Sequence, residues 1–204
     1  MSAMTTDATA LGFERLHGSE IGHRVDELAE LRMTVFREWP YLYDGDFEYE
    51  RQYLQYYIDS PRAFALLVLD AGRPVGATTA MPLADEAEAM QRPFRTAGFD
   101  VERVFYNAES ILLPEYRGLG LYRHFFDARE GVARAYGDYD WITHCAVQRP
   151  ADHPLRPADA RPLDDVWRHF GYERRPDLMA TYPWRDVGDT QETEKPLMFW
   201  LKAL

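Results

Sequence analysis

The fold is decided by residues 104–126, which have the sequence VFYNAESILLPEYRGLGLYRHFF. Residues 105–113 are expected to form a largely apolar strand that ends at Pro114. The turn Arg117-Gly118-Leu119-Gly120 then opens a helix expected over 118–136. Glycines let backbone N–H groups converge there without a Cβ in the way, and the dipole of the helix favours negative charge. The stretch therefore predicts an anion site, for which a diphosphate is the natural occupant.

Two other phosphate-binding motifs fit this stretch less well. A dinucleotide-binding fingerprint also places glycines after a strand, but the third glycine of that motif is missing after Gly120. A Walker A loop is excluded because no Gly-Lys-Ser/Thr is present. An ordinary strand-to-helix turn without a ligand remains the alternative.

Apolar periodicity on both sides of this stretch predicts the remaining elements. The order is β, α, α, β, β, α, β, α, β, α, β, β, which indicates an α/β or α+β mixed sheet with helices on both faces. Residues 1–10 are small and polar and are expected to be disordered, and 11–204 to form a single domain. The expected strands are 11–16, 64–69, 75–81, 105–113, 141–147, 172–183 and 197–201, and the expected helices are 25–36, 46–60, 85–96, 118–136 and 163–170.

The composition narrows the possible partners. A formal charge of −11 argues against a nucleic-acid surface, because phosphate contacts need clustered Lys and Arg. Cys145 is the only cysteine, so an intrachain disulfide is impossible and an oxidising compartment is not implied. No apolar run approaches the length of a membrane span. We therefore expect a cytoplasmic protein that binds neither nucleic acid nor membrane.

The decisive stretch resembles the acyl-CoA signature of the GNAT acyltransferases, which is Arg or Gln, two residues, Gly, one residue, then Gly or Ala. Arg117 and Gly120 comply, whereas Tyr122 stands where a small residue is usual and is expected to crowd the phosphates or alter the exit path of the nucleotide. The resemblance implies a central, mostly antiparallel twisted sheet of about seven strands. It also implies that the co-substrate is acetyl-CoA or another acyl-CoA. The residues it implies for CoA binding are Ile111, Leu112, Leu113, Arg117, Gly118, Leu119, Gly120, Leu121, Tyr122 and Trp167.

The family mechanism is direct attack of a primary amine on the thioester, so a base, an acid and an oxyanion donor are needed. We expect a strand amide near Ile111 or Leu112 to meet the thioester carbonyl. Asn107 and Glu109 are expected to share one strand face, with Glu109 as the base, raised in pKa by burial. The alternative is that Glu109 pairs with an arginine.

The proton donor is less obvious, because Trp167 stands where many family members carry a tyrosine. Indole cannot supply that proton, so Tyr172, a water or solvent is expected to do so. Trp167 itself is expected either to contact the pantetheine arm or, as the plainer alternative, to be a core aromatic.

The resemblance also implies that the link between the first two helices borders the acceptor site. In this link aromatic residues alternate with carboxylates, and Tyr41 and Tyr43 are the candidate residues, because aromatic faces and acids together suit a cationic amine. The alternative is that the acids belong to a solvated helix start. The expected acceptor is a small-molecule or peptide amine.

Residues elsewhere carry weaker hypotheses. His144 and Cys145 are adjacent on a strand and face opposite ways, so a Cys-His pair is not expected and His144 is expected to be structural. A metal site at His144, Asp152, His153 and His169 matches no known ligand spacing, so no metal is expected.

The C-terminal half also resembles, more loosely, the acetyltransferase portion of bacterial fusions with a carbon-nitrogen hydrolase. The resemblance rests on 144–150, on His153-Pro154-Leu155-Arg156-Pro157 and on 195–201. The apolar 198–201 strand could pair across a homodimer axis or be buried within one chain. Competing functions are a GNAT-fold module that binds acyl-CoA without transferring the acyl group, and a purely structural domain.

Overall fold

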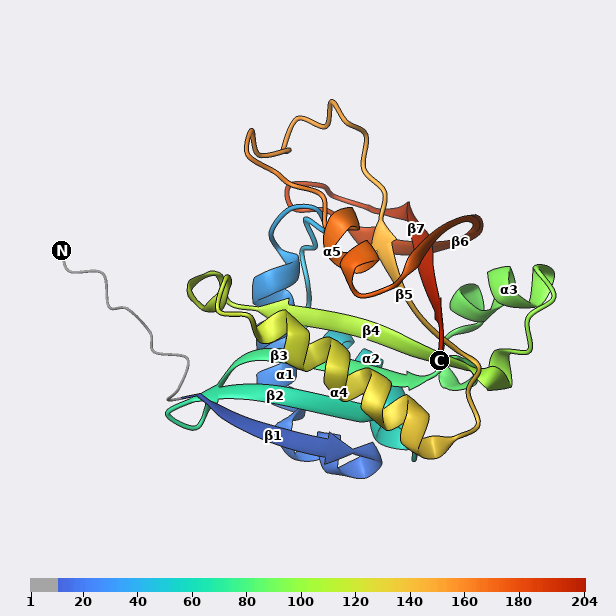
Figure 1. Cartoon of the computed structure of the whole chain (residues 1–204). Helices are drawn as coiled ribbons and strands as arrows, with labels where there is room; N and C mark the ends of the chain where they lie inside the picture. Colours follow the sequence, from blue (N-terminus) through green and yellow to red (C-terminus); the bar gives the residue numbers. More distant parts are fainter. Residues whose placement is uncertain (1–10) are drawn as a thin grey trace.

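The structure is a computed structural model that describes residues 11–204. The disorder expected for residues 1–10 lies outside the described residues. The strands are β1 (Gly12–His17), β2 (Phe64–Asp70), β3 (Arg73–Pro82), β4 (Val104–Leu112), β5 (Trp141–Val147), β6 (Glu173–Arg185) and β7 (Glu192–Ala203). The α-helices are α1 (Val25–Phe36), α2 (Phe47–Asp59), α3 (Glu88–Thr96), α4 (Leu121–Tyr136) and α5 (Asp164–His169) (Figure 1).

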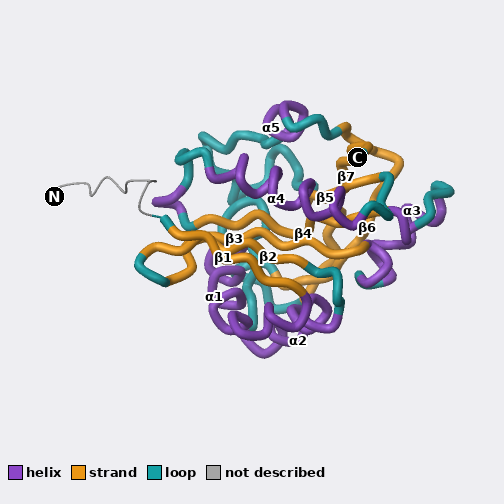
Figure 2. Tube along the Cα trace, turned by 60° about the horizontal axis from the view of Figure 1, so that its bottom comes forward, coloured by secondary structure: helices purple, strands orange, loops and turns teal. Residues whose placement is uncertain are grey.

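The centre of the molecule is one seven-stranded sheet in the order β1-β2-β3-β4-β5-β7-β6. Neighbouring strands are antiparallel except β4 and β5, which run parallel. Helices α1 and α2 cover one face, and α4 covers the other (Figure 2). The predicted mixed, mostly antiparallel sheet with helices on both faces is confirmed.

Helices cover both faces of the sheet at β2, which explains why residues 64–69 of this strand are all apolar. Ala65 and Leu67 lie in the hydrophobic cluster shared with α1 and α2. Phe64, Leu66 and Val68 lie in the cluster shared with α4. Successive side chains of a strand point to opposite faces, so a strand covered twice needs an apolar residue at every position.

Helix α2 is held in a defined rotation. Its N-cap is Asp46, as the sequence predicted, and the carboxylate accepts a hydrogen bond of 3.1 Å from the N–H of Tyr49. Leu54 and Tyr57 are fully buried against α1 and the sheet. Tyr49 and Tyr53, which are four residues apart, lie next to each other on the helix surface. Both line the recess described below.

The predicted order of elements is confirmed, and the differences lie at their ends. The helix expected over 118–136 begins at Leu121, because Gly118 and Gly120 have positive φ angles that an α-helix does not contain. The helix expected over 85–96 is α3, preceded by a 3-10 turn at Leu83–Asp85. The last two strands are longer than expected and pair from Glu173 opposite Leu201 to Arg185 opposite Glu192. Within residues 11–204, no helix is long and apolar enough to cross a bilayer.

Candidate functional site

The loop between β4 and α4 presents backbone amides that have no partner. Gly118 and Gly120 have φ angles of 79° and 78°, and nothing lies within 4 Å of where a Cβ would stand on either. Among the backbone hydrogen bonds of residues 11–204, none is donated by residues 118–122. These N–H groups stand at the start of a 16-residue helix, whose dipole favours an anion. The loop therefore fits a phosphate group in both shape and charge.

The side chains around the loop hold it against the strand. Arg117 donates from Nε to the carbonyl of Leu112 at 3.1 Å and pairs with Glu38 at 2.8 Å. Leu113, Leu119 and Leu121 pack into the core between the sheet and α4. Leu121 is buried there, whereas Leu113 and Leu119 are half-buried.

Tyr122, the departure from the motif, is directed at β4. Its ring lies 6.2 Å from that of Phe125 and 6.1 Å from that of Phe126, between centroids. Its hydroxyl donates to the carbonyl of Ser110 at 3.3 Å. The ring thus occupies the space between α4 and the gap described next, and the open positions beside Gly118 and Gly120 remain clear.

A gap opens in the sheet between β4 and β5. The two strands pair only over Val104–Tyr106 and Trp141–Thr143, although β4 continues to Leu112 and β5 to Val147. Figure 1 shows β5 turning away from β4 toward β7. The residues of β4 beyond Tyr106 thus have a partner strand, β3, on one side only.

The ladder to β3 decides which amides of β4 face the gap. Leu113 donates its N–H to the carbonyl of Val75 at 3.0 Å. Hydrogen-bonded residues alternate along an antiparallel strand, so Ile111 also faces β3, and Ser110 and Leu112 face the gap. The N–H of Leu112 thus faces the gap, whereas the backbone of Ile111 faces β3 and its side chain is buried in the core. The N–H of Ser110, which the sequence did not single out, also faces the gap. The role of these amides as oxyanion donors stays a prediction.

The expectation that Asn107 and Glu109 share a strand face is wrong. The register shifts between the pairs Thr79–Glu109 and Ala80–Asn107, which leaves Ala108 as an extra residue in β4. This β-bulge breaks the alternation of side chains. Asn107 consequently bonds to Tyr172 on the α4 side, and Glu109 contacts Arg32 of α1 on the other side.

Glu109 belongs to a buried charge cluster. The guanidinium of Arg32 contacts the carboxylates of both Glu50 and Glu109, and their side chains are 9%, 0% and 4% exposed, respectively. Glu109 also accepts a hydrogen bond of 2.9 Å from Thr79. The pairing of Glu109 with an arginine, the alternative considered for this residue, is therefore present. Its role as a base stays a prediction.

A recess of about 110 Å³ lies beside Glu109 on the face covered by α1 and α2. Tyr41 and Tyr43 line it, so the structure brings together the predicted acceptor residues and the predicted base. Tyr106 and Cys145, whose hydroxyl and Sγ are 3.2 Å apart, come from the two strands that separate at the gap. The other lining residues are Arg32, Phe36, Tyr49, Tyr53, Glu86, Met90, Ala108, Tyr182, Trp184 and Leu197.

Tyr41 is held in the recess by a salt bridge that the sequence did not reveal. Arg149 binds both carboxylate oxygens of Asp186, at 2.6 and 2.8 Å, and donates to the carbonyls of Pro40 and Tyr41. Trp184 donates to the same Tyr41 carbonyl at 3.0 Å. The ion pair therefore fixes the segment from which Tyr41 projects.

Asp186→Asn is expected to destabilise the protein by about 3 kcal/mol at neutral pH, because Arg149 is left buried without its counter-charge. Burial alone would raise the pKa of Asp186, but Arg149 and Lys195 hold it below its usual value. A depressed pKa stabilises the folded state at neutral pH, and this contribution is lost as the pH falls through the folded-state pKa. Urea unfolding at several pH values should show the two proteins converging in acid. Asp189 is an exposed residue nearby, so Asp189→Asn should leave the free energy of unfolding within about 0.5 kcal/mol of wild type.

The buried charges of Arg32 and Glu50 were not identified from the sequence, although the sequence holds a signal for both. Arg32 lies four residues after Leu28 on the buried side of α1, and Glu50 lies four residues before Leu54 on the buried side of α2. Opposite charges within the apolar stripes of two consecutive helices indicate a buried ion pair.

Tyr172, His144 and Trp167 form a second cluster on the α4 side. The hydroxyl of Tyr172 accepts a hydrogen bond of 3.0 Å from Asn107, and burial raises its pKa above the usual value. His144 packs 4.7 Å from Tyr172 and 4.9 Å from Trp167, between ring centroids, and burial lowers its pKa. Trp167 is half-buried and packs against Trp200 at the edge of this aromatic cluster, and its contact with a pantetheine arm stays a prediction. His144 and Cys145 face opposite ways, as predicted.

The four residues considered for a metal do not come together. His144 is buried in the aromatic cluster, His153 packs on Trp39, and His169 packs on Phe170. Among residues 11–204, no group of three or more His, Cys, Asp or Glu side chains is close enough to hold a metal ion.

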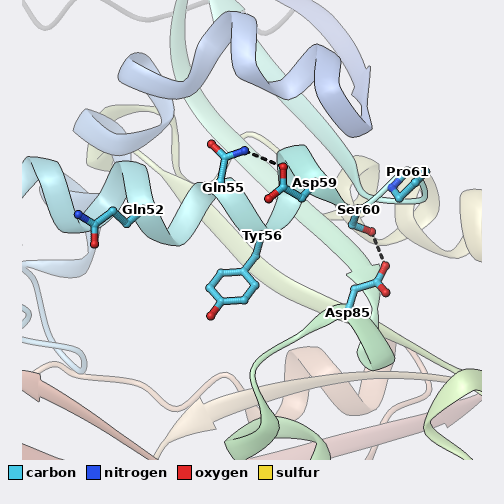
Figure 3. Close-up of a pocket in the computed structure, with 7 residues that line it drawn as sticks. All are labelled: Gln52, Gln55, Tyr56, Asp59, Ser60, Pro61 and Asp85. Carbon is cyan, nitrogen blue, oxygen red and sulfur yellow. Dashed lines mark hydrogen bonds between the residues drawn. The ribbon is translucent and has the colours of Figure 1, made fainter.

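A more open depression of about 440 Å³ lies at the C-terminal end of α2 (Figure 3). Its polar side chains bond to one another, with Gln55 donating to Asp59 at 2.7 Å and Ser60 to Asp85 at 2.5 Å. None of the predicted site residues lines it, and the glycine loop is at the far end of β4. The recess beside Glu109 is therefore the better candidate site.

Solved structures share this fold over nearly the whole chain. A protein described as an acetyltransferase of the GNAT family, from Desulfovibrio desulfuricans, has a TM-score of 0.56 at 8% identity and covers 95% of this chain and 99% of its own. An acetyltransferase from Streptococcus agalactiae has a TM-score of 0.58 at 13% identity, with 96% and 99% covered. A ribosomal-protein-alanine N-acetyltransferase from Brucella melitensis has 0.58 at 15%, with 94% and 99% covered. No protein-family model and no curated protein matches the chain. These likenesses show that the chain has the GNAT fold.

Proposed function

We propose that this GNAT-fold chain transfers an acyl group, acetyl in the simplest case, from an acyl-CoA to a primary amine. The observation that carries the proposal is that three features meet at one gap in the sheet. A loop of unpaired amides leads to the gap from the α4 side. Backbone groups of Ser110 and Leu112 face into it. An aromatic, acidic recess reaches it from the α1 and α2 side.

Donor binding would use the loop and the strand. The amides of residues 118–122 would hold the pyrophosphate, and Arg117 would add a positive charge beside it. The carbonyls of Ser110 and Leu112 already accept from Tyr122 and Arg117, so their N–H groups are what the gap-facing side of β4 offers to a ligand. These N–H groups would stabilise negative charge on an acyl oxygen.

The acceptor amine would enter the recess beside Glu109. The nitrogen of its ammonium form must first lose a proton. The neutral nitrogen then forms a bond to the acyl carbon, the carbon–sulfur bond breaks, and the sulfur of CoA gains a proton. Glu109, buried on the recess side of the bulge, is the candidate to take the first proton, directly or through water. Tyr41 and Tyr43 supply aromatic surface for the cationic form of the amine.

Tyr172 is the candidate to supply the proton to sulfur. Burial keeps its phenol protonated, as its raised pKa indicates. Its hydroxyl accepts from Asn107, which leaves its own hydrogen to be donated to another group. Trp167, in the usual tyrosine position, donates no useful proton, so a slow leaving-group step is expected if Tyr172 does not serve.

The test is calorimetric titration with CoA and acetyl-CoA, followed by a screen of primary amines for acylated product by mass spectrometry. Saturable binding with product formation supports transfer. Binding without product across the panel favours the acyl-CoA-binding module, an alternative supported by Trp167 and by the pairing of Glu109 with Arg32. Failure of CoA to bind or to raise the melting temperature contradicts both functions and leaves a structural domain.

A further inference from the structure

The recess carries more negative charge than its one arginine can balance. Among residues 11–204, Arg32 is the only Lys or Arg that lines it, and this guanidinium already contacts two carboxylates, those of Glu50 and Glu109. Oε1 of Glu50 is buried without a hydrogen-bond partner in the described chain. The cluster therefore has a net charge of about −1 before any other group of the recess is considered.

Glu86 is a further carboxylate of the recess, and it has no cationic partner. Its residue is 5% exposed, and within residues 11–204 no Lys, Arg or His lies within 4.0 Å of it. It accepts hydrogen bonds from the hydroxyl of Tyr53 at 3.2 Å and from the N–H of Ala87 at 2.5 Å. Burial raises its pKa even though the charge of Arg32 acts to lower it, so a guanidinium that already contacts two other carboxylates does not offset the burial of Glu86. Buried carboxylates are normally paired, so a cation from outside the chain would complete this arrangement.

Tyr53 contacts both acidic positions. The guanidinium carbon of Arg32 lies 4.3 Å from the centre of the Tyr53 ring, and the hydroxyl of the same ring bonds to Glu86. Arg32, Glu109 and Glu86 all line the same recess.

The walls between these positions are aromatic. Tyr49 of α2 and Tyr182 of β6 meet with their hydroxyls 3.2 Å apart, and Tyr106 lies on β4 near the gap. Aromatic faces attract ammonium groups and also accommodate the methylene chain between two of them. Such a lining suits a slender alkyl chain with a positive charge at each end.

We propose that the acceptor carries a second cationic group, with its reacting amine beside Glu109 and its second ammonium bound by Glu86. The inference rests on the proposed function and extends it from an amine to a diamine or an equivalent dication. Glu86 would determine specificity and would not take part in the chemistry. The structural alternative is that Glu86 serves only as an acceptor for Tyr53 and Ala87.

The test compares amines that differ by one charge, on protein saturated with CoA so that no transfer occurs. Calorimetry would measure the affinities of 1,5-diaminopentane and pentylamine, and of 1,4-diaminobutane and butylamine as a second chain length. At least one diamine should bind about tenfold or more tightly than its monoamine. In Glu86→Gln, that ratio should fall below about twofold while monoamine affinity is unchanged. The amide oxygen of Gln can still accept from the N–H of Ala87, and its NH2 group can donate to the Tyr53 hydroxyl, which can accept as well as donate. The fold is therefore expected to be kept, and melting temperatures would verify this.

Glu88→Gln is the matched control, because Glu88 is an exposed carboxylate of the same segment, paired with Arg95 and outside the recess. It should preserve the wild-type ratio. Equal affinity for diamine and monoamine in the wild type, no binding of any of the four amines, or an unchanged ratio in Glu86→Gln would each overturn the inference. Loss of CoA binding in the wild type, by contrast, would contradict the proposed function itself.

Discussion

Gly120→Glu is expected to weaken CoA binding by about 100-fold or more. The substitution places a carboxylate where the unpaired amides of residues 118–122 converge, so it repels the pyrophosphate and occupies its space. Nothing of the protein lies within 4 Å of a Cβ at this position, so the new side chain meets no packed neighbour. Calorimetric titration with CoA measures the effect directly.

The control must reproduce the backbone strain of that substitution, because Gly120 has a φ of 78°. Gly137, at the other end of α4, has a φ of 75° and is equally open around its Cβ position. Gly137→Glu should therefore lose a similar amount of stability and keep its affinity for CoA. An equal loss of affinity in both variants would mean that strain in α4, and not charge at the loop, weakens binding.

Glu109→Gln is expected to lower kcat by about 100-fold or more, because the amide cannot take a proton from the amine. The affinity for CoA should stay within about twofold of wild type, since Glu109 lies on the recess side of the sheet and the glycine loop on the other. Single-turnover rates with saturating acetyl-CoA separate this loss from any change in binding.

Glu50→Gln distinguishes a base from a mere ion-pair partner. Both carboxylates contact Arg32, so each substitution removes one counter-charge from the same guanidinium. If Glu109 only neutralises Arg32, the two variants should lose stability and activity alike. If Glu109 is the base, Glu109→Gln should have a much lower kcat than Glu50→Gln. Urea unfolding would verify that the two variants are similarly stable.

The sequence was sufficient for the fold wherever a local signal coincided with the global one. The apolar run of β2, the Asp46 cap of α2 and the glycines before α4 each satisfy a local requirement that also suits the sheet. Element ends were less predictable. The helix after β4 begins at Leu121 because positive φ angles hold Gly118 and Gly120 outside it.

The site was predicted less completely, because its charges come together only in three dimensions. Tyr41, Tyr43 and Glu109 were identified and do line one recess, but Arg149 and Asp186, which position Tyr41, lie far from it in the sequence. The bulge at Ala108 was also invisible, because strict alternation assigns Asn107 and Glu109 to one face. A single extra residue in β4 is what separates them.

The sheet separates the two routes that lead to the gap between β4 and β5. The glycine loop belongs to the α4 side, and the recess belongs to the side of α1 and α2. In kinetic terms, two substrates that bind from opposite sides can occupy the protein together, so neither has to depart before the other binds. Double-reciprocal plots of initial rate against acetyl-CoA concentration, at several fixed amine concentrations, should then intersect and not run parallel. Desulfo-CoA should compete with acetyl-CoA but not with the amine.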